Sequence, residues 1–315
     1  MGHVKVMRGK VHDYLGMILD FTDNGALKVD MVYYIKGMFE EFPYPIGSTK
    51  ATPWTEKLLK IDHNAPKLEE ERRKIFHRFV MKCMFLCKRA RPDIDQGISF
   101  LSSRVKEANE GDWTKLMRVL GFLKGTIDDV LKLEADDTNT LTWYIDAAFA
   151  VHEDMKSHTG AMFTMGKGAI IGSSTKQKVN SRSSTESELI GVDDKISRVL
   201  WTKRFLEWQE FLVKLNIIYQ DNTSTMKLER NGKESSGKRT RHFDIKYFYV
   251  ADLIGREEVE VEYCNTDEML ADYNTKPVVG FKFALFRDRW MNLSGKHHHI
   301  LPQECVGRMR NKRKV

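Results

Sequence analysis

The stretch Trp143-Tyr144-Ile145-Asp146-Ala147-Ala148-Phe149 decides how the second half of this 315-residue sequence folds. Its aromatic and β-branched residues favour a β-strand, which leads directly to one aspartate and then to small residues. A carboxylate at the end of a buried strand has to be hydrated, paired or bound to a metal, because leaving it bare in an apolar setting is energetically costly. Asp146 is therefore the first candidate for a functional residue.

Three further carboxylates lie in similar settings downstream of Asp146. Glu188 precedes the apolar run of a predicted helix, Asp221 ends a predicted strand, and Asp272 follows an apolar tripeptide. Whole helices or strands fit between successive members, so all four can meet at one edge of a sheet. Taken singly, each is more simply explained as a helix cap or a solvated surface carboxylate. The hypothesis of a shared site therefore depends on all four acids being present together.

The pattern after residue 139 predicts an α/β (α+β) fold with a mixed five-stranded sheet and flanking helices. Elements are expected in the order β-β-β-α-β-α-α-β-α. The first expected strand ends at Asp146, and the other four span residues 161–165, 169–171, 217–220 and 259–263. The helices run from about Thr185 to Trp208, over 223–230 and 243–254, and from about Thr266.

The first 132 residues read as a mainly helical region. Residues 14–21 and 26–30 predict a β-hairpin, because Asp23-Asn24-Gly25 between them supplies a tight turn. A helix over 32–42, a proline-rich connection over 43–66, and helices over 68–89, 94–106 and 112–124 follow. The polar segment 133–139 marks the expected boundary to the second region.

Charge and apolar patterning restrict the class of protein. The 51 Lys and Arg residues against 44 Asp and Glu give a net charge of +7, which suits a polyanionic partner without requiring one. No apolar run approaches the roughly 20 residues of a membrane helix, and no signal-peptide core follows the first residues. We therefore expect no membrane partner. Cys83, Cys87, Cys264 and Cys305 have no zinc-ligand spacing, and the apolar helical pattern around the first two predicts buried free thiols, so we expect an intracellular, cytoplasmic or nuclear, location.

The order of several short phrases resembles copia-type LTR retrotransposon polyproteins. Together these phrases are similar to the ribonuclease H domain of such polyproteins, and no single one would be specific. They are Tyr144-Ile145-Asp146-Ala147-Ala148-Phe149, His158-Thr159-Gly160, Ser174-Thr175-Lys176-Gln177, Ser183-Ser184-Thr185-Glu186-Ser187-Glu188, Tyr219-Gln220-Asp221-Asn222, Arg239-Thr240-Arg241-His242 and Leu270-Ala271-Asp272-Tyr273-Asn274-Thr275-Lys276-Pro277.

The resemblance extends over residues 4–290 and implies a domain division. Asp13-Tyr14-Leu15-Gly16-Met17 looks like the primer-gripping hairpin of a reverse transcriptase, and two segments, 89–94 and 113–126, look like its thumb and connection segments. The implied parts are a C-terminal reverse transcriptase fragment over 1–132, a ribonuclease H-like domain over 133–290 and a basic tail over 291–315.

The resemblance implies hydrolysis of the RNA strand of an RNA–DNA hybrid with two Mg²⁺ ions, for which Mn²⁺ could substitute. Hard carboxylate oxygens suit such ions, which activate water and stabilise the leaving oxygen. By match to the family, Asp146 bridges the two ions, Asp221 and Asp272 each bind one, and Glu188 holds the ion on the leaving-group side. The hybrid and the rest of the polyprotein are the implied partners.

Two of these assignments have rivals in the sequence. Glu186 and Glu188 point about 200° apart on a helix, so only one can face the ions. We choose Glu188, because an apolar run follows it directly, as in related ribonucleases H. Asp267 is the rival of Asp272, but beside Thr266 it is explained as an acid at a helix start.

The basic loop containing Lys238, Arg239, Arg241 and His242 is the candidate for contact with nucleic-acid phosphates. A solvated basic loop is an equally good explanation of these residues. No histidine lies between His242 and Asp272, which argues against the histidine-assisted product release of some ribonucleases H.

Polymerase activity is not expected. The pairs Asp128-Asp129, Asp136-Asp137 and Asp193-Asp194 all lack the preceding tyrosine of a polymerase turn, and the sequence begins close to the primer-grip-like hairpin. The alternative to a ribonuclease H is an inactive retroelement remnant that only binds nucleic acid. Loss of Mg²⁺-dependent cleavage in Asp146→Asn would distinguish the two.

Overall fold

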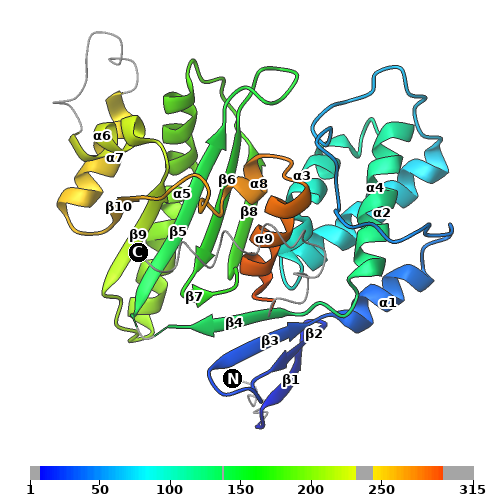
Figure 1. Cartoon of the computed structure of the whole chain (residues 1–315), viewed down its shortest axis with the longest axis horizontal. Helices are drawn as coiled ribbons and strands as arrows, with labels where there is room; N and C mark the ends of the chain where they lie inside the picture. Colours follow the sequence, from blue (N-terminus) through cyan, green and yellow to red (C-terminus); the bar gives the residue numbers. More distant parts are fainter. Residues whose placement is uncertain (1–7, 137, 232–243, 294–315) are drawn as a thin grey trace, which may run out of the picture.

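A mixed five-stranded sheet forms the centre of the computed structural model, which describes residues 8–136, 138–231 and 244–293 (Figure 1). Its strand order is β10-β9-β5-β6-β8. Strands β5, β6 and β8 are antiparallel neighbours, whereas β9 and β10 run parallel to β5. The predicted mixed sheet is confirmed. The strands are β5 (Thr140–Ala148), β6 (His158–Thr164), β8 (Ile171–Lys176), β9 (Leu215–Gln220) and β10 (Glu260–Tyr263).

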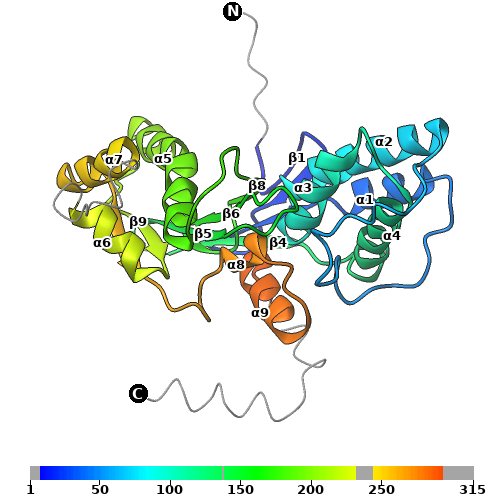
Figure 2. The ribbon, with the colours of Figure 1, turned by 90° about the horizontal axis from the view of Figure 1, so that it is seen from above.

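Helices cover both faces of this sheet. Helix α5 (Ser184–Trp208) lies on one face, and the short α8 (Asp272–Thr275) and α9 (Gly280–Met291) lie on the other (Figure 2). Side chains of β5 alternate accordingly. Trp143 belongs to the apolar cluster that includes residues of α5, while Tyr144 stacks on Tyr219 with ring centroids 5.2 Å apart. Helices α6 (Thr223–Asn231) and α7 (Asp244–Gly255) pack beside α5.

A second sheet has the order β1-β2-β3-β4-β7. The predicted hairpin is present between β2 (Met17–Asp20) and β3 (Ala26–Asp30). The prediction of one continuous first strand over residues 14–21 is wrong, because a turn interrupts it. Leu15 and Gly16 have φ values of 52° and 75°, so a second tight turn separates β1 (Val11–Tyr14) from β2. The apolar run through Leu15 concealed this turn.

Strand β4 (Leu131–Ala135) joins the two halves of the chain. It pairs with β3 on one side and with β7 (Gly166–Lys167) on the other. The expected division between residues 132 and 133 therefore falls within a strand. This second sheet is built from both sides of that position.

The helices predicted in the first half are confirmed to within a few residues. Asn109 caps the last of them with a capping box, because its side chain accepts from the Asp112 amide while the Asp112 carboxylate accepts from the Asn109 amide. The helices are α1 (Val32–Glu40), α2 (Glu70–Cys87), α3 (Asp95–Arg104) and α4 (Glu110–Gly125), with a 3-10 turn, η1 (Pro92–Ile94), before α3.

One apolar core spans the two expected domains. It contains Phe76 of α2 and Leu116 of α4 together with Phe286 and Trp290 of α9. Hydrogen bonds cross the same boundary: Trp54 Nε1 donates to Val278 O (2.8 Å), and Tyr273 Oη donates to Asp93 O (2.9 Å). The two halves are thus covered by each other, and the experiments below use the whole chain.

The predicted start of the last helix, at about Thr266, is wrong. Residues 266–271 form turns, α8 begins only at Asp272, and an extended Lys276 precedes Pro277. Proline disfavours the helical conformation of the residue before it, which separates α8 from α9. The explanation of Asp267 as a helix-start acid fails with it, since the Asp267 amide instead donates to Asn265 Oδ1 in a turn.

Gly160 of β6 allows α8 to approach the sheet. A Cβ at Gly160 would lie 2.6 Å from Thr275 Cγ2 and 2.7 Å from the backbone oxygen of Ala271. We expect Gly160→Ala to lower the free energy of unfolding by about 2 kcal/mol or more, because the backbone of α8 has to shift. Gly191→Ala is the control, since its nearest contact would be an ordinary 3.4 Å. Equal urea midpoints for the two variants would show that α8 can shift away from the added methyl group at little cost in stability.

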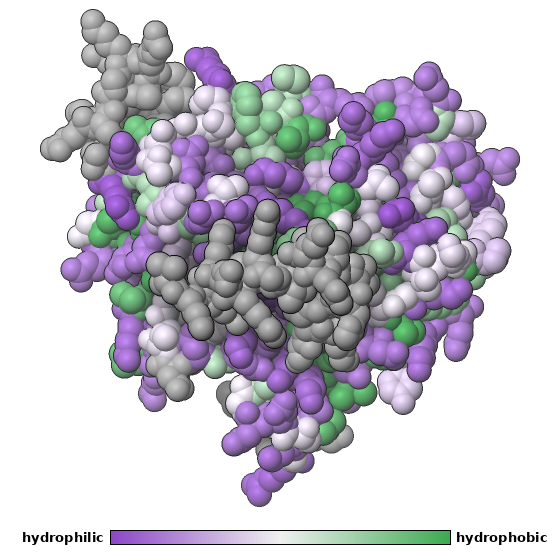
Figure 3. Space-filling view, viewed as in Figure 1, coloured by the Kyte–Doolittle hydropathy of each residue, from purple (hydrophilic) through white to green (hydrophobic). Residues whose placement is uncertain are grey.

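Within the described residues, none of the helices combines the length and apolarity needed to cross a membrane. Hydrophilic residues dominate the face shown in Figure 3, and hydrophobic ones appear there in separate patches.

Candidate metal centre

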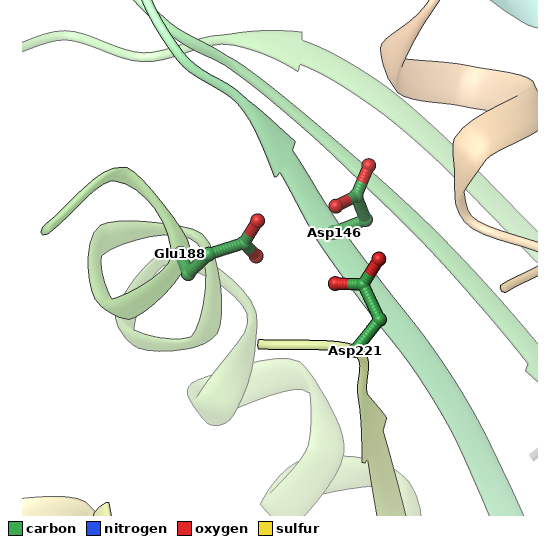
Figure 4. A group of neighbouring side chains, drawn as sticks. All are labelled: Asp146, Glu188 and Asp221. Atoms are coloured by element: carbon green, nitrogen blue, oxygen red, sulfur yellow. The ribbon is translucent and has the colours of Figure 1, made fainter. Parts of the chain in front are cut away.

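Asp146, Glu188 and Asp221 converge at one edge of the central sheet. Each offers a carboxylate oxygen, and these three atoms all lie within 4.8 Å of one another. Figure 4 shows the side chains pointing into a common space from β5, from α5 and from the end of β9. Because β5 and β9 are parallel neighbours, their carboxyl ends meet at the same edge.

Hydrogen bonds fix the orientation of these carboxylates. The Ala147 amide donates to Glu188 Oε2 (3.1 Å), which ties the first turns of α5 to β5. Thr275 Oγ1 donates to Asp146 Oδ2 (2.6 Å), and Thr266 Oγ1 donates to Asp221 Oδ2 (3.0 Å). The sequence reading missed both threonines, although Thr275 stands only three residues after Asp272.

Burial and mutual repulsion disfavour the ionised forms of two of the three carboxylates. Asp146 is 1% and Glu188 5% exposed. Burial, assisted by Asp272 and Asp221, raises the pKa of Asp146 to about 6 despite the opposing charge of Lys276. Burial, followed by the charges of Asp146 and Asp221, raises the pKa of Glu188 well above its ordinary value. A divalent cation would relieve this repulsion.

Glu186, the rival of Glu188, faces elsewhere. Its amide donates to Ser183 Oγ, the N-cap of α5, and its carboxylate accepts from the Arg182 amide. Glu186 therefore closes the start of the helix. Of the two glutamates, the structure brings Glu188 to Asp146 and Asp221.

Asp272 lies beside this group but has other partners. It is 1% exposed, and its two carboxylate oxygens accept from Lys276 Nζ (2.6 Å) and Lys282 Nζ (2.7 Å). Burial acts to raise the pKa of Asp272, but the two lysines hold it below its ordinary value. Lys276 Nζ also lies 3.6 Å from Asp146 Oδ2. Asp272 is thus an ion-paired neighbour of the three carboxylates.

An open cavity of about 660 Å³ gives access to the carboxylates. Besides the three acids, its lining includes Ser184, Asn222 and Lys276. The proposed phosphate contacts Lys238, Arg239, Arg241 and His242 lie outside the described residues. Of the tail expected over 291–315, Met291 is instead the buried last residue of α9, and residues 294–315 lie outside the described residues.

The sheet order and the acids at one edge define the second half as a mixed α/β domain with flanking helices, which is consistent with the expected ribonuclease H-like fold. The sequence is 29% identical over 286 residues to the Retrovirus-related Pol polyprotein from transposon TNT 1-94 of Nicotiana tabacum, covering 89% of this chain and 21% of that protein. It is 32% identical over 225 residues to the Pol polyprotein from transposon RE2 of Arabidopsis thaliana, covering 70% of this chain and 15% of that protein.

The chain belongs to the family of copia-type Pol polyproteins, as its sequence phrases indicated. A putative transposon Ty5-1 protein of Saccharomyces cerevisiae is 27% identical over 193 residues, covering 61% of this chain and 62% of that protein. The chain spans about a fifth or less of the plant polyproteins.

No protein-family model matches the chain. A foamy viral protease-reverse transcriptase, solved in complex with dsDNA, aligns with a TM-score of 0.39 and 12% identity, covering 82% of this chain and 45% of that one.

Proposed function

We propose that this part of a retrotransposon Pol polyprotein hydrolyses the RNA strand of RNA–DNA hybrids at the acidic edge of its central sheet. The observation that carries the proposal is the convergence of Asp146, Glu188 and Asp221 within 4.8 Å at an open cavity. Three elements distant in sequence supply these side chains, which distinguishes the group from a run of surface acids.

The donor set fits a divalent cation. All three ligands are hard oxygen donors, two of them are buried, and burial with like charges raises their pKa values. Such a set suits Mg²⁺, with Mn²⁺ as a substitute. When bound, the ions of such a centre activate water and stabilise the charge of the leaving oxygen. Asp272 would be the fourth carboxylate of a two-ion centre, as the resemblance implies.

Hydrogen bonds from surrounding residues preorganise the three carboxylates. Thr275 and Thr266 orient one carboxylate each, and the Ala147 amide orients Glu188. Because these groups are fixed before substrate binds, little reorganisation is needed during the reaction. The net charge of +7 and the basic sequence at 238–242 suit the phosphates of a hybrid. Action on a reverse-transcription intermediate implies an intracellular, cytoplasmic or nuclear, place of work.

The second candidate function is binding of nucleic acid without hydrolysis. It is favoured by the ion pairs that Asp272 makes with Lys276 and Lys282, which occupy both of its carboxylate oxygens. Polymerase activity is not part of either proposal, because Asp193-Asp194 lies inside α5 and Asp129 is paired with Arg287.

The test is cleavage by the full chain of an end-labelled RNA strand within an RNA–DNA hybrid. We expect the protein to cut the hybrid in the presence of Mg²⁺ and not in the presence of EDTA. We expect no cutting of duplex RNA or duplex DNA. Glu188→Gln should reduce the rate at least about a hundredfold, since it removes a charged ligand. Glu186→Gln is the matched control and should retain the rate. A folded wild-type protein that binds hybrid but never cuts it would support the second candidate.

A further inference from the structure

Lys276 places a positive charge at the edge of the candidate metal centre. Its Nζ lies 2.6 Å from Asp272 Oδ1 and 3.6 Å from Asp146 Oδ2. The side chain is 46% exposed and lines the cavity that contains the three carboxylates. One ammonium group thus stands between two acids of the expected ligand set.

Lys282 completes the neutralisation of Asp272 from the other side. Its Nζ lies 2.7 Å from Asp272 Oδ2, so each carboxylate oxygen of Asp272 faces an ammonium group. Lys282 differs from Lys276 in two respects: it does not line the cavity, and no ion pair connects it to Asp146 among the described contacts. The two lysines therefore offer a matched comparison at the same carboxylate.

We propose that Lys276 holds the position of a second divalent cation in the substrate-free protein and contacts a nucleic-acid phosphate when substrate binds. This inference rests on the proposed hydrolytic function. An ammonium group has three N–H donors. One points to Asp272 and a second faces Asp146, which leaves the third for a phosphate oxygen in the cavity.

The side chain is suited to such an exchange. A lysine carries a compact charge on a flexible stem, and the exposed half of Lys276 faces the open cavity. Movement of Nζ toward a phosphate would free oxygens of Asp272 and Asp146 together, while Lys282 keeps one positive charge at Asp272. The first cation accordingly binds without substrate, and the second binds with it.

The direct test is calorimetric titration of the full chain with Mg²⁺ alone, without nucleic acid. We expect one bound ion in the wild type and a second in Lys276→Met, or at least an affinity for the second ion raised about tenfold. Lys282→Met is the control and should still bind one ion. Thermal unfolding of both variants checks their folding, and Lys276→Gln replaces Lys276→Met if the latter is unstable.

Two outcomes of this titration would overturn the inference. One is a wild-type protein that already binds two ions without nucleic acid, and the other is an unchanged isotherm in folded Lys276→Met. A purely structural ion pair at the end of α8 would change stability but leave the number of bound ions the same. Because the titration requires no hydrolysis, its result does not depend on whether the chain cuts hybrids.

Phosphate contact is tested by hybrid affinity in Ca²⁺. Lys276→Met should weaken binding about tenfold and reduce the slope of log affinity against log salt by about one, whereas Lys276→Arg should retain most of the affinity. Equal affinity and slope for wild type and Lys276→Met would exclude the contact. If both lysine results are as expected and wild type still fails to cut, the proposed hydrolysis fails while the role of Lys276 in cation and phosphate binding stands.

Discussion

Asp146→Asn is expected to abolish Mg²⁺-dependent cleavage of the hybrid while making the metal-free protein more stable. The amide has nearly the shape of the carboxylate and can still accept from Thr275 Oγ1. It lacks the negative charge that a cation requires, so the rate should fall by roughly a thousandfold or more. Single-turnover cleavage at saturating enzyme measures this loss separately from any change in binding.

The gain in stability follows from the raised pKa of Asp146, which is about 6 in the folded protein against an ordinary 3.8. Above pH 6 the carboxylate is ionised in both states, and the folded state bears the unfavourable charge. Well below pH 3.8 it is protonated in both states, so the variant and the wild type should agree there, and most of their difference should already be lost at pH 4. We expect Asp146→Asn to raise the free energy of unfolding on the order of 1–2 kcal/mol at pH 7 in EDTA, after loss of the Lys276 contact.

Urea unfolding of both proteins at pH 4 and pH 7 in EDTA checks the stability expectation. Added Mg²⁺ should stabilise the wild type more than Asp146→Asn, because only the complete site binds the ion well. A variant that cuts at the wild-type rate would exclude Asp146 as a ligand. A variant less stable than wild type in EDTA would show that Asp146 is held mainly by its ion pair with Lys276.

Arg287→Met should cause the largest loss of stability. Arg287 is 3% exposed, and its guanidinium donates to Asp93 Oδ2 (2.8 Å) and Asp129 Oδ2 (2.6 Å). Arg91, also buried, donates to both oxygens of Asp93. Removing one partner from a buried ion network leaves uncompensated charge, so we expect a cost of about 3–5 kcal/mol. Arg289→Met, at an exposed position on the same helix, is the control.

The same network predicts how stability depends on pH. Burial opposes ionisation of Asp93, but Arg91 and Arg287 outweigh it and lower the pKa of Asp93 to about 2. The stabilisation is therefore present above pH 4 and is lost as the pH falls from 4 toward 2. Acid titration of the unfolding midpoint should show a shallower decline in Arg287→Met than in wild type. Parallel curves would mean that Arg91 alone holds Asp93 ionised.

Local pattern was sufficient to predict most of the helices and strands, including those that carry the candidate acids. The strand before Asp146 and the apolar run after Glu188 are both short-range signals, and both correspond to elements of the structure. The turn at Leu15 and Gly16 was missed because apolar residues flank it on both sides. The break between α8 and α9 follows from Pro277, which disfavours a helical conformation at Lys276.

The surroundings of the acids could not be predicted in the same way. Lys282 reaches Asp272 from the next helix, so the pair depends on how α8 and α9 are placed. Arg287 meets Asp93 from 194 residues away. No periodicity within either segment encodes such a contact, because it arises only when distant elements pack. Sequence reading therefore identified candidate ligands better than it identified what neutralises or orients them.

The position of α9 has a consequence for the order of synthesis and folding. Trp290 and Phe286 complete an apolar core that begins near residue 29, and the Ala169 amide donates to Trp290 O. A ribosome must therefore deliver almost the whole described chain before Trp54 and Phe122 obtain the cover that Phe283 of α9 provides. Nascent chains that stop before residue 280 would keep this apolar surface open, which favours association with other unfinished chains.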